Sequence, residues 1–360
     1  MQTSELDYDL PQELIAQTPI EPRDAARLLV INRKTGQLTH RVFGDMVEYL
    51  YPGDLLVANE SRVIPARLRA RKARTGGEVE LLLLRRLDER TWQSLAGGKR
   101  VQAGTQLDVL DRSGRSVLRA EVTQAGEGPQ RIVQFNEPVE AYFDAVGITP
   151  LPPYIHAPLA DPERYQTIYS HTPGSAAAPT AGLHFTPDLM LALRHQGVEF
   201  AFVTLHVGLD TFQPVDEERV EEHRIHTEWC SLSPEIARQI NQARLAGKRI
   251  IAVGTTTVRV LETAARKSQR SDSKCRPDGS APACGWQTVS AFEGFTDLFI
   301  YPGYQFCAVD AMLTNFHLPR STLLALVSAF AGRGLIFHAY QEATRERYRF
   351  YSFGDAMFLM

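Results

Sequence analysis

Cysteine is scarce in this sequence of 360 residues. The chain has four cysteines, and no two of them form a C-x-x-C pair. This spacing excludes a zinc ribbon and a dithiol redox motif. So few thiols indicate a reducing compartment rather than a disulfide-rich secreted protein, so we expect a cytoplasmic location. The cysteines are Cys230, Cys275, Cys284 and Cys307. We expect the middle two to be bystanders in a mobile surface loop over the polar segment 267–287.

Long apolar runs, a signal peptide and strong charge of either sign are also missing. The longest apolar run, 323–331, is much shorter than the ~20 residues that a membrane-spanning helix needs. The N-terminal residues have neither the basic nor the apolar region of a signal peptide. The formal net charge is −3. We therefore expect no membrane association, and any RNA contact has to come from a local basic patch.

The sequence has no G-x-G-x-x-G pattern and no Walker motif, so neither a dinucleotide site nor a nucleoside triphosphate site is expected. It does have a strand, a Gly-Thr turn and a helix over residues 248–263. Such a unit presents backbone N–H groups and hydroxyls to a ligand at the helix N-terminus. A simple helix cap is the alternative for Thr256 and Thr257. The candidates for a substrate pocket here are Gly254, Thr255, Thr256, Arg259 and Glu262.

Two turns that carry histidines flank a helix and a strand in segment 179–214. The signals for capping and stopping predict a helix between Thr186 and Gly197, and a short buried strand follows over 199–205. His184 precedes the helix. His206 leaves the strand at its carboxyl end, where α/β sheets bind ligands. The alternative is that both histidines are structural residues of tight turns.

Residues 221–228 read Glu-Glu-His-Arg-Ile-His-Thr-Glu. The spacing H-x-x-H-x-E matches no standard metal site such as H-E-x-x-H, so we predict no metal there. His226 and Glu228 are instead candidates for acid/base or polar-binding roles. Asn315 and His317 join them, because they occupy a polar turn between a predicted strand and a capped helix.

The character of the chain changes near residues 62 and 150. Between them lie short strand-like segments that are separated by glycine-rich turns and have almost no helical period. This spacing is typical of a small β-barrel or sandwich. Strands and helices alternate in the rest of the chain, which indicates an α/β domain. We predict an α/β main domain of residues 1–61 and 151–360 and an inserted β-barrel domain of residues 62–150.

The inserted domain begins with a basic segment. Residues 62–74 hold six cations and no acid. On a strand, Arg67, Arg69 and Arg71 would share one face. Together with Arg62 they are candidates for a stripe that binds RNA phosphates, because arginine contacts phosphate bidentately. The alternative is the solvated face of a barrel strand.

Several longer motifs follow one another along almost the whole chain. They include Ala178-Pro-Thr-Ala-Gly-Leu-His-Phe, Phe202-Val-Thr-Leu-His-Val-Gly, Val253-Gly-Thr-Thr-Thr-Val-Arg, Thr314-Asn-Phe-His-Leu-Pro-Arg-Ser-Thr-Leu and Tyr348-Arg-Phe-Tyr-Ser-Phe-Gly-Asp-Ala-Met. This ordered set resembles the S-adenosylmethionine:tRNA ribosyltransferase-isomerase family of queuosine biosynthesis.

The resemblance implies a two-domain monomer with a barrel-like α/β main domain and an inserted small antiparallel β-barrel domain. It implies a transferase that acts on tRNA carrying 7-aminomethyl-7-deazaguanine at the wobble position. S-adenosylmethionine is then a consumed substrate that donates its ribosyl part. Adenine and methionine leave, and the base becomes epoxyqueuosine. No further cofactor and no metal are expected.

The reaction that the resemblance implies needs groups that accept and donate protons. The catalytic candidates are His184, His206, His226, Glu228 and His317. The candidates for substrate binding are Thr180, Gly182, Gly254, Thr255, Thr256, Arg259, Glu262 and Asn315. The candidates for RNA binding are Arg62, Arg67, Arg69 and Arg71.

This chain departs from the family's usual pattern at a few positions. Asp210 replaces a glycine, Thr227 and Thr257 replace serines, Glu60 replaces an aspartate or asparagine, and loop 267–287 is unusually long. Two other classes of protein are also considered. The histidines 184, 206, 223 and 226 suggest a metal-dependent hydrolase, and the arginine stripe suggests a non-catalytic RNA-binding module. Both leave the ordered motifs unexplained.

Overall fold

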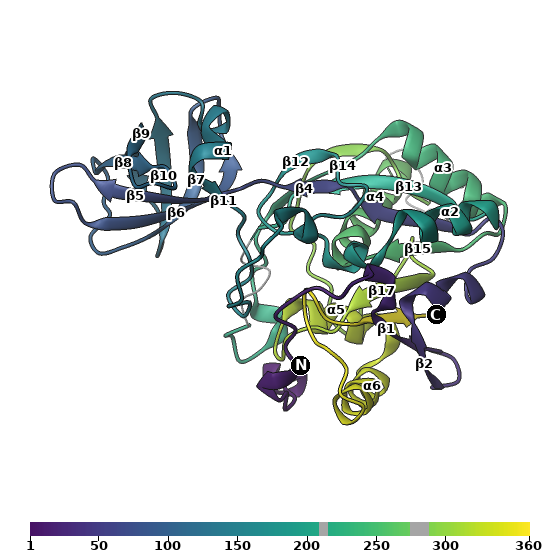
Figure 1. The fold of residues 1–360 in the computed structure, drawn as a ribbon. Helices are drawn as coiled ribbons and strands as arrows, with labels where there is room; N and C mark the ends of the chain where they lie inside the picture. The colour runs from purple at the N-terminus through teal and green to yellow at the C-terminus, as the bar shows by residue number, and fades with distance from the viewer. Residues whose placement is uncertain (209–214, 274–287) are drawn as a thin grey trace. The chain divides into compact units, whose positions relative to one another are not determined.

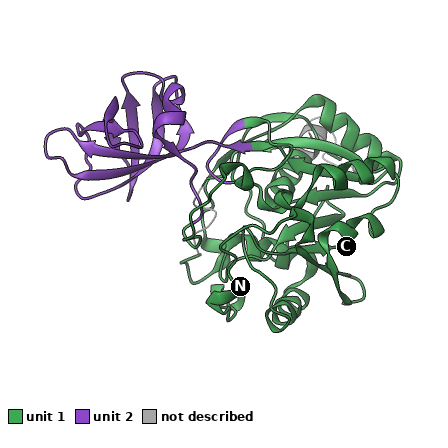
Figure 2. Cartoon of the chain, in the orientation of Figure 1, with its two compact units in different colours: residues 1–61, 153–172, 178–360 green, residues 62–152, 173–177 purple. Residues whose placement is uncertain are grey.

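The computed structural model describes residues 1–208, 215–273 and 288–360 (Figure 1). The departure at Asp210 and the cysteines at 275 and 284 lie outside these ranges. The chain divides into two compact units (Figure 2). Unit 1 contains residues 1–61, 153–172 and 178–360, and unit 2 contains residues 62–152 and 173–177. The insertion that we predicted at 62–150 falls inside unit 2.

Unit 1 is built on a nine-stranded mixed sheet. Four neighbouring strands, β13, β3, β15 and β17, run parallel, and so their carboxyl ends meet at one edge of the sheet. β18 is antiparallel to β17 and parallel to β1. In spatial order the strands are β16 (Phe292–Thr296), β14 (Glu228–Leu232), β13 (Glu199–Leu205), β3 (Leu55–Asn59), β15 (Ile250–Val253), β17 (Ala311–Asn315), β18 (Ala356–Leu359), β1 (Arg27–Ile31) and β2 (Leu38–Val42).

The central strands β3, β15, β17 and β18 are mostly apolar, as expected for strands that are covered on both faces, and polar residues stand only at the carboxyl ends of β3 and β17. All residues of these four strands are buried. β2, at one edge, is largely exposed. Among the described strands, the hydrogen-bonded sheet ends at β16 on one side and at β2 on the other. The predicted barrel-like domain would require the sheet to curve until its two edges approach each other. The α/β class of this unit is confirmed.

The helices of unit 1 pack on this sheet or on one another. α4 packs against β13, β14, β15 and β16, α3 packs against β13 and β15, and α6 packs against α5 and β1. No single described helix is long and apolar enough to cross a membrane; α5 and α6 pass such a test only as a pair, bent by 114°. The α-helices of unit 1 are α2 (Pro187–His195), α3 (Pro234–Leu245), α4 (Thr255–Ser273), α5 (Thr322–Ala331) and α6 (Arg333–Arg345). Short 3-10 helices are η1 (Thr3–Leu6), η2 (Gln12–Leu14), η3 (Arg23–Ala25), η4 (Phe43–Glu48), η6 (Pro162–Tyr165), η7 (Thr180–His184) and η9 (Val220–Glu222).

The prediction of a surface loop over 267–287 is wrong for the first residues of this range, because α4 continues to Ser273. Lysine, glutamine and arginine favour helices in spite of their polarity. Ser268 is only 1% exposed, and the Lys267 ammonium lies 4.9 Å from the centre of the Phe292 ring. Packing on β16 therefore extends the helix beyond its apolar part. The rest of the predicted loop, 274–287, lies outside the described residues.

Unit 2 contains a closed six-stranded antiparallel barrel, which confirms the predicted fold of the insertion. Each strand pairs with its neighbours in the order β5-β6-β7-β10-β9-β8, and the pairing of β8 with β5 closes the barrel. Its elements are β5 (Arg67–Lys72), β6 (Glu78–Arg86), β7 (Thr91–Gly97), β8 (Gln106–Leu110), β9 (Ser116–Ala125), β10 (Gln130–Phe135), η5 (Val139–Tyr142), α1 (Phe143–Val146) and β11 (Gly147–Ile148). The short strands β4 (Ser61–Val63) and β12 (Thr172–Ser175) pair with each other.

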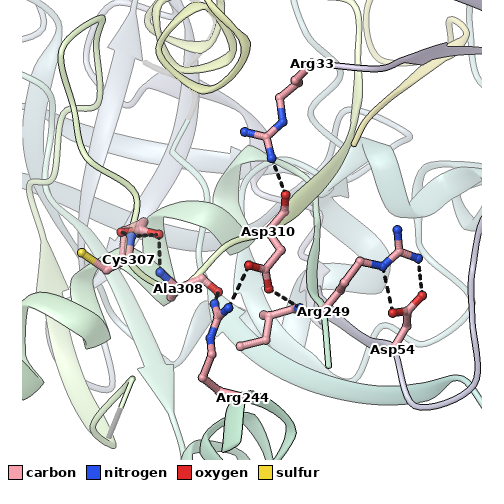
Figure 3. Close-up of polar contacts among 9 residues, drawn as sticks. Arg33, Asp54, Arg244, Arg249, Cys307, Ala308 and Asp310 are labelled. Atoms are coloured by element: carbon pink, nitrogen blue, oxygen red, sulfur yellow. Dashed lines mark hydrogen bonds and ion pairs between the residues drawn. The ribbon is translucent and has the colours of Figure 1, made fainter. Parts of the chain in front are cut away.

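Charged side chains hold together the amino ends of the parallel strands (Figure 3). The Arg249 guanidinium, just before β15, donates two hydrogen bonds to the Asp54 carboxylate, just before β3. Asp310, just before β17, accepts 2.8 Å from Arg244 and 2.7 Å from the N–H of Ile250. These contacts fix the register of β3, β15 and β17 at one end, and leave their carboxyl ends for other groups.

Candidate substrate pocket

A pocket lies at the carboxyl ends of the parallel strands of unit 1. It encloses about 630 Å³ of empty space, including space that is open to solvent. Four segments that are far apart in the sequence meet there: 178–181, 207, 254–256 and 314–318. No lining residue is an aspartate, glutamate, lysine or arginine. The complete lining is Tyr154, Ala178, Pro179, Thr180, Ala181, Val207, Gly254, Thr255, Thr256, Thr314, Asn315, Phe316, His317, Leu318, Ser321, Leu323, Tyr351 and Ser352.

One wall of the pocket is the turn from β15 into α4. β15 ends at Val253, and Gly254 adopts a φ of +89°, which is favourable only for glycine. The Gly254 N–H donates to the Leu313 carbonyl at 2.7 Å and so ties this turn to β17. Thr255 and Thr256 then open the helix and face the pocket. Five of the predicted substrate-binding residues therefore line the cavity: three from this turn, and Thr180 and Asn315 from other segments.

The next residue, Thr257, is one of the departures from the family's pattern. Its hydroxyl donates to the Val253 carbonyl at 2.7 Å, and its side chain is fully buried. The hydroxyl is therefore used inside the turn and does not face the pocket. A serine would offer the same donor, so the change preserves the contact.

His317 is the only catalytic candidate that lines the pocket. The Thr314 hydroxyl lies 2.9 Å from its Nε2, so Nδ1 is the ring nitrogen that is left for a bound molecule. The backbone around it is fixed, because the His317 N–H donates to the Tyr340 hydroxyl at 2.9 Å and the Tyr8 hydroxyl donates to its carbonyl at 2.6 Å. Burial lowers the pKa of His317 from 6.5 to about 3. The imidazole is therefore neutral at pH 7.

Asn315 connects the pocket to His184. Its Oδ1 accepts from the Thr180 hydroxyl at 3.2 Å, and its Nδ2 donates to the Tyr351 carbonyl at 3.1 Å and to His184 Nε2 at 3.3 Å. The His184 ring stacks on Phe43 with a centroid distance of 4.9 Å, and burial lowers its pKa to about 4. His184 thus supports the floor of the pocket through Asn315 without lining it.

Gly182, another substrate-binding candidate, has a packing role in the structure. A Cβ at this position would lie 2.0 Å from the Tyr169 hydroxyl and 2.8 Å from a methyl of Thr167. The residue is buried in η7 and does not line the pocket. Glycine is needed here because η7 packs directly against these side chains.

A second polar cluster lies beside the pocket, at the carboxyl end of β13. The carboxylate of Glu228 and the guanidinium of Arg259 form a buried ion pair, with side chains 7% and 5% exposed. Glu228 Oε1 also accepts from the Gly208 N–H at 3.0 Å, and Arg259 Nε donates to the Leu298 carbonyl at 3.1 Å. Because Val207 lines the pocket, this ion pair holds one of its walls.

His206 belongs to the same cluster. Its ring stacks on Trp229, with a centroid distance of 5.1 Å and an interplanar angle of 16°. Burial lowers its pKa to about 4. Its Nδ1 has no hydrogen-bond partner among the residues that the structure describes. His206 itself does not line the pocket, although the next residue does.

The remaining candidates lie away from the cavity. Glu262 accepts hydrogen bonds from the N–H groups of Cys307 and Ala308 (Figure 3) and from the Tyr304 hydroxyl. Burial raises its pKa. It therefore anchors the loop before β17. His226 is exposed in the segment that leads into β14. Among the described residues, no group of three or more histidines, cysteines or acids is placed to hold a metal ion.

The candidate RNA stripe belongs to unit 2. The side chains of β5 alternate as expected, with Leu68 and Ala70 buried and Arg69 and Arg71 exposed. Acids face the stripe from the neighbouring strands: Glu80 lies opposite Arg69 on β6, and Arg67 Nε is 3.6 Å from the Glu80 carboxylate. Residues 62–152 hold 15 lysines and arginines and 11 acids. The unit is thus basic in a chain that is acidic as a whole.

Sequence reasoning missed the aromatic wall of the pocket. Tyr154 and Tyr351 face each other with ring centroids 4.8 Å apart, and the Tyr154 hydroxyl lies 2.8 Å from the Ser352 hydroxyl. Phe316 also lines the pocket, but its ring packs against Tyr340, Tyr348 and Phe350. Tyr154 stands in a proline-rich segment and Tyr351 near the C-terminus, and neither position carries a local signal for a binding site. Only the fold brings them together.

The buried histidines make the stability of the fold sensitive to acid. The folded-state pKa of His184 is depressed from 6.5 to about 4, so below pH 6.5 the unfolded chain binds a proton that the folded chain does not. Its contribution to stability is complete above pH 6.5 and is lost as the pH falls towards 4. We expect a slope of about 1.4 kcal/mol per pH unit from this residue. Urea unfolding of wild type and His184→Asn at pH 7, 6 and 5 measures it. Equal slopes for both proteins would show that His184 is not buried in the neutral form.

The chain is similar to known proteins over almost its whole length. A family model described as "Queuosine biosynthesis protein" matches residues 3–359. Curated relatives from Dehalococcoides mccartyi (strain CBDB1) and Moorella thermoacetica are 49% and 51% identical over 100% of each chain. Both are named S-adenosylmethionine:tRNA ribosyltransferase-isomerase. A crystal structure of S-adenosylmethionine tRNA ribosyltransferase from Thermotoga maritima is 42% identical, covers 99% of this chain and 100% of its own, and gives a TM-score of 0.54.

Proposed function

The chain belongs to the queuosine biosynthesis family of S-adenosylmethionine:tRNA ribosyltransferase-isomerases, and on this basis we propose that its pocket in unit 1 is where the ribosyl group is transferred. The enzyme moves and isomerises the ribosyl part of S-adenosylmethionine onto tRNA. The acceptor in our proposal is 7-aminomethyl-7-deazaguanine at the wobble position, and the products are epoxyqueuosine-tRNA, adenine and methionine. S-adenosylmethionine is consumed, and no further cofactor is required. We also propose a cytoplasmic monomer.

The observation that carries this proposal is a neutral histidine in a pocket without charged side chains. The sulfonium of S-adenosylmethionine acidifies the adjacent 5′ carbon, and a positioned base has to remove a proton there. His317 is unprotonated at pH 7 and so can accept a proton, but burial also makes it a weak base in the ligand-free pocket. His317, with Nε2 held by Thr314, offers Nδ1 for this step.

The other candidates act in this proposal by holding the pocket in shape. Asn315 is fixed by Thr180, Tyr351 and His184, so its amide is oriented before a substrate arrives. The Glu228–Arg259 ion pair fixes the wall at Val207 and Gly208. The rings of Tyr154 and Tyr351, which line the pocket, provide aromatic surface on which a purine or deazapurine ring can stack. The alternatives of a metal-dependent hydrolase and a non-catalytic RNA-binding module do not account for the full-length relatives.

We propose that the arginines of β5 contribute to tRNA binding through phosphate contacts. Replacing Arg67, Arg69 and Arg71 together with glutamine is expected to weaken tRNA binding, and to reduce the slope of log Kd against log salt by about 1 for each phosphate that the variant no longer neutralises. Filter binding of tRNA at several salt concentrations measures both. The matched control is Arg119→Gln on β9 of the same barrel, whose side chain is 81% exposed. The stripe has no role in binding if the triple variant and the control behave alike.

The activity itself is tested with purified protein, S-adenosylmethionine and tRNA that carries the aminomethyl precursor. We expect adenine and methionine to be released in equal amounts, and the tRNA to gain the mass of the transferred group. Unmodified tRNA is the control, because without the free amine there is no acceptor. Adenine release that is the same with both tRNAs, or absent with both, would contradict the proposed function.

A further inference from the structure

S-adenosylmethionine carries a carboxylate, and the pocket has no cationic side chain to bind it. The lining residues include no lysine and no arginine, and burial keeps the lining His317 neutral. The nearest guanidinium along α4, that of Arg259, is paired with Glu228 and does not line the cavity. An anion that enters this pocket therefore has to be bound by neutral donors.

The N-terminus of α4 provides such donors. α4 starts at Thr255 directly after Gly254, and glycine has no side chain with which to cap the helix. Three other helices have a side-chain cap, since Thr186 on α2, Ser233 on α3 and Ser321 on α5 each accept from a backbone N–H of the first turn. α6, which follows Gly332, has none, but no residue of α6 lines the pocket. The N–H groups of Thr255 and Thr256 have no such acceptor among the described residues. The positive end of the helix dipole adds to their attraction for an anion.

An independent observation concerns the Thr255 side chain. Thr255 is only 6% exposed and lines the pocket, and within the described part of the chain its hydroxyl has no hydrogen-bond partner. Every other serine or threonine hydroxyl in the lining is engaged. Thr180 contacts Asn315, Thr256 contacts Asn59, Thr314 contacts His317, Ser321 contacts Leu318 and Leu324, and Ser352 contacts Tyr154. The Thr255 oxygen is not one of the fully buried unpaired atoms of the described residues, so it is accessible from the pocket, where a ligand can accept its hydrogen bond.

From these observations we propose that the N-terminus of α4 binds the carboxylate of the methionine part of S-adenosylmethionine. The carboxylate accepts hydrogen bonds from the N–H groups of Thr255 and Thr256 and from the Thr255 hydroxyl. This inference rests on the proposed function, since it takes S-adenosylmethionine as the ligand. An RNA phosphate has the same hydrogen-bonding chemistry, but Thr255 is buried inside the pocket, where the carboxylate of a small molecule fits better than a polynucleotide backbone.

Binding measurements with two ligands test the proposal. The first is S-adenosylmethionine, and the second is its decarboxylated analogue, which keeps the adenosine, the sulfonium and the amine. Hydrogen bonds to a charged group are strong, so we expect wild-type protein to bind S-adenosylmethionine about 10- to 100-fold more tightly than the analogue. Equal affinity for the two ligands would overturn the proposal. Loss of binding to both ligands would instead speak against the proposed function.

Substitution of Thr255 provides the second arm. Thr255→Val keeps the β-branched shape and removes the hydroxyl, so the preference for S-adenosylmethionine over the analogue is expected to fall by about tenfold, while affinity for the analogue is unchanged. Thr255→Ser is expected to restore the preference.

An unchanged preference in Thr255→Val overturns the assignment of the hydroxyl. Weaker tRNA binding by Thr255→Val with the preference unchanged would show that an RNA phosphate is the ligand, and would also overturn it. If Thr255→Val fails to fold, the comparison of the two ligands on wild type still decides.

Discussion

Replacing His317 with alanine is expected to lower kcat for adenine release by about 10²- to 10⁴-fold, which is the usual contribution of a positioned acid or base. The imidazole is the one titratable side chain with a shifted pKa in the pocket apart from the tyrosines. Its Nε2 is already engaged by Thr314, so Nδ1 is left to act on the substrate. The affinity for S-adenosylmethionine is expected to change much less than kcat. Single-turnover release of adenine, together with a separate binding measurement, distinguishes the two effects.

The controls for this prediction are other histidines of unit 1. His171→Ala removes an exposed imidazole and is expected to leave turnover within about twofold of wild type, because surface substitutions usually have small effects. His184→Asn is expected to give an intermediate loss, because it acts through Asn315 and not on the substrate. A His317→Ala enzyme with kcat close to wild type would exclude His317 as the base. The acid/base role would then have to be sought at His206.

Replacing Arg259 with methionine is expected to lower the free energy of unfolding by about 3–5 kcal/mol. The side chain of Glu228 is 7% exposed, and it would lose its counter-ion while remaining buried. The hydrogen bond from the Gly208 N–H does not compensate for a buried charge that has lost its counter-ion. Urea denaturation at pH 7 gives the difference. Because the pair holds the turn at Val207 and Gly208, we also expect weaker binding of S-adenosylmethionine by the folded variant.

A double variant separates the ion pair from simple packing. Arg259→Met combined with Glu228→Gln removes both charges, and it is expected to recover a large part of the stability lost in the single variant. Arg333→Gln, at an arginine that is 48% exposed, is the control for the loss of a cation and should change stability by less than about 0.5 kcal/mol. If the double variant is as unstable as the single one, the cost comes from poorer packing at residue 259 and not from the unpaired carboxylate.

Much of the fold could be predicted wherever the sequence signal is local. The predicted strand 199–205 is β13, and the predicted cap at Thr186 is the N-cap of α2. The short strand-like segments predicted between residues 62 and 150 are the strands of the barrel, such as β8. Each of these elements has an apolar pattern with turn residues at both ends. The prediction for the first residues of 267–287 was wrong, because their polar composition suggested a loop. In the structure, contacts with β16 extend α4 over these residues.

The sequence predicted which segments form the pocket better than it predicted which of their side chains face it. Strand-to-helix turns after parallel strands meet at one edge of a sheet, and the pocket indeed draws on the turns near Thr180, Val207, Gly254 and Asn315. Which way each side chain points depends on tertiary packing. His184 turns onto Phe43 and His206 onto Trp229, while His317 faces the cavity. Periodicity and spacing contain no information about those choices.

The two units differ in how far apart their partners lie along the chain, and this sets an order for folding during synthesis. The barrel of unit 2 is closed by strands that all lie between Arg67 and Phe135. By contrast, β3 (Leu55–Asn59) lies between β13 and β15, which start at Glu199 and Ile250, and β1 (Arg27–Ile31) pairs with β18, which starts at Ala356. Local contacts form faster than distant ones. The inserted barrel can therefore fold on the ribosome before the strands that pair with β1 and β3 have been synthesised. Premature termination before residue 356 would leave a folded barrel attached to an incomplete sheet.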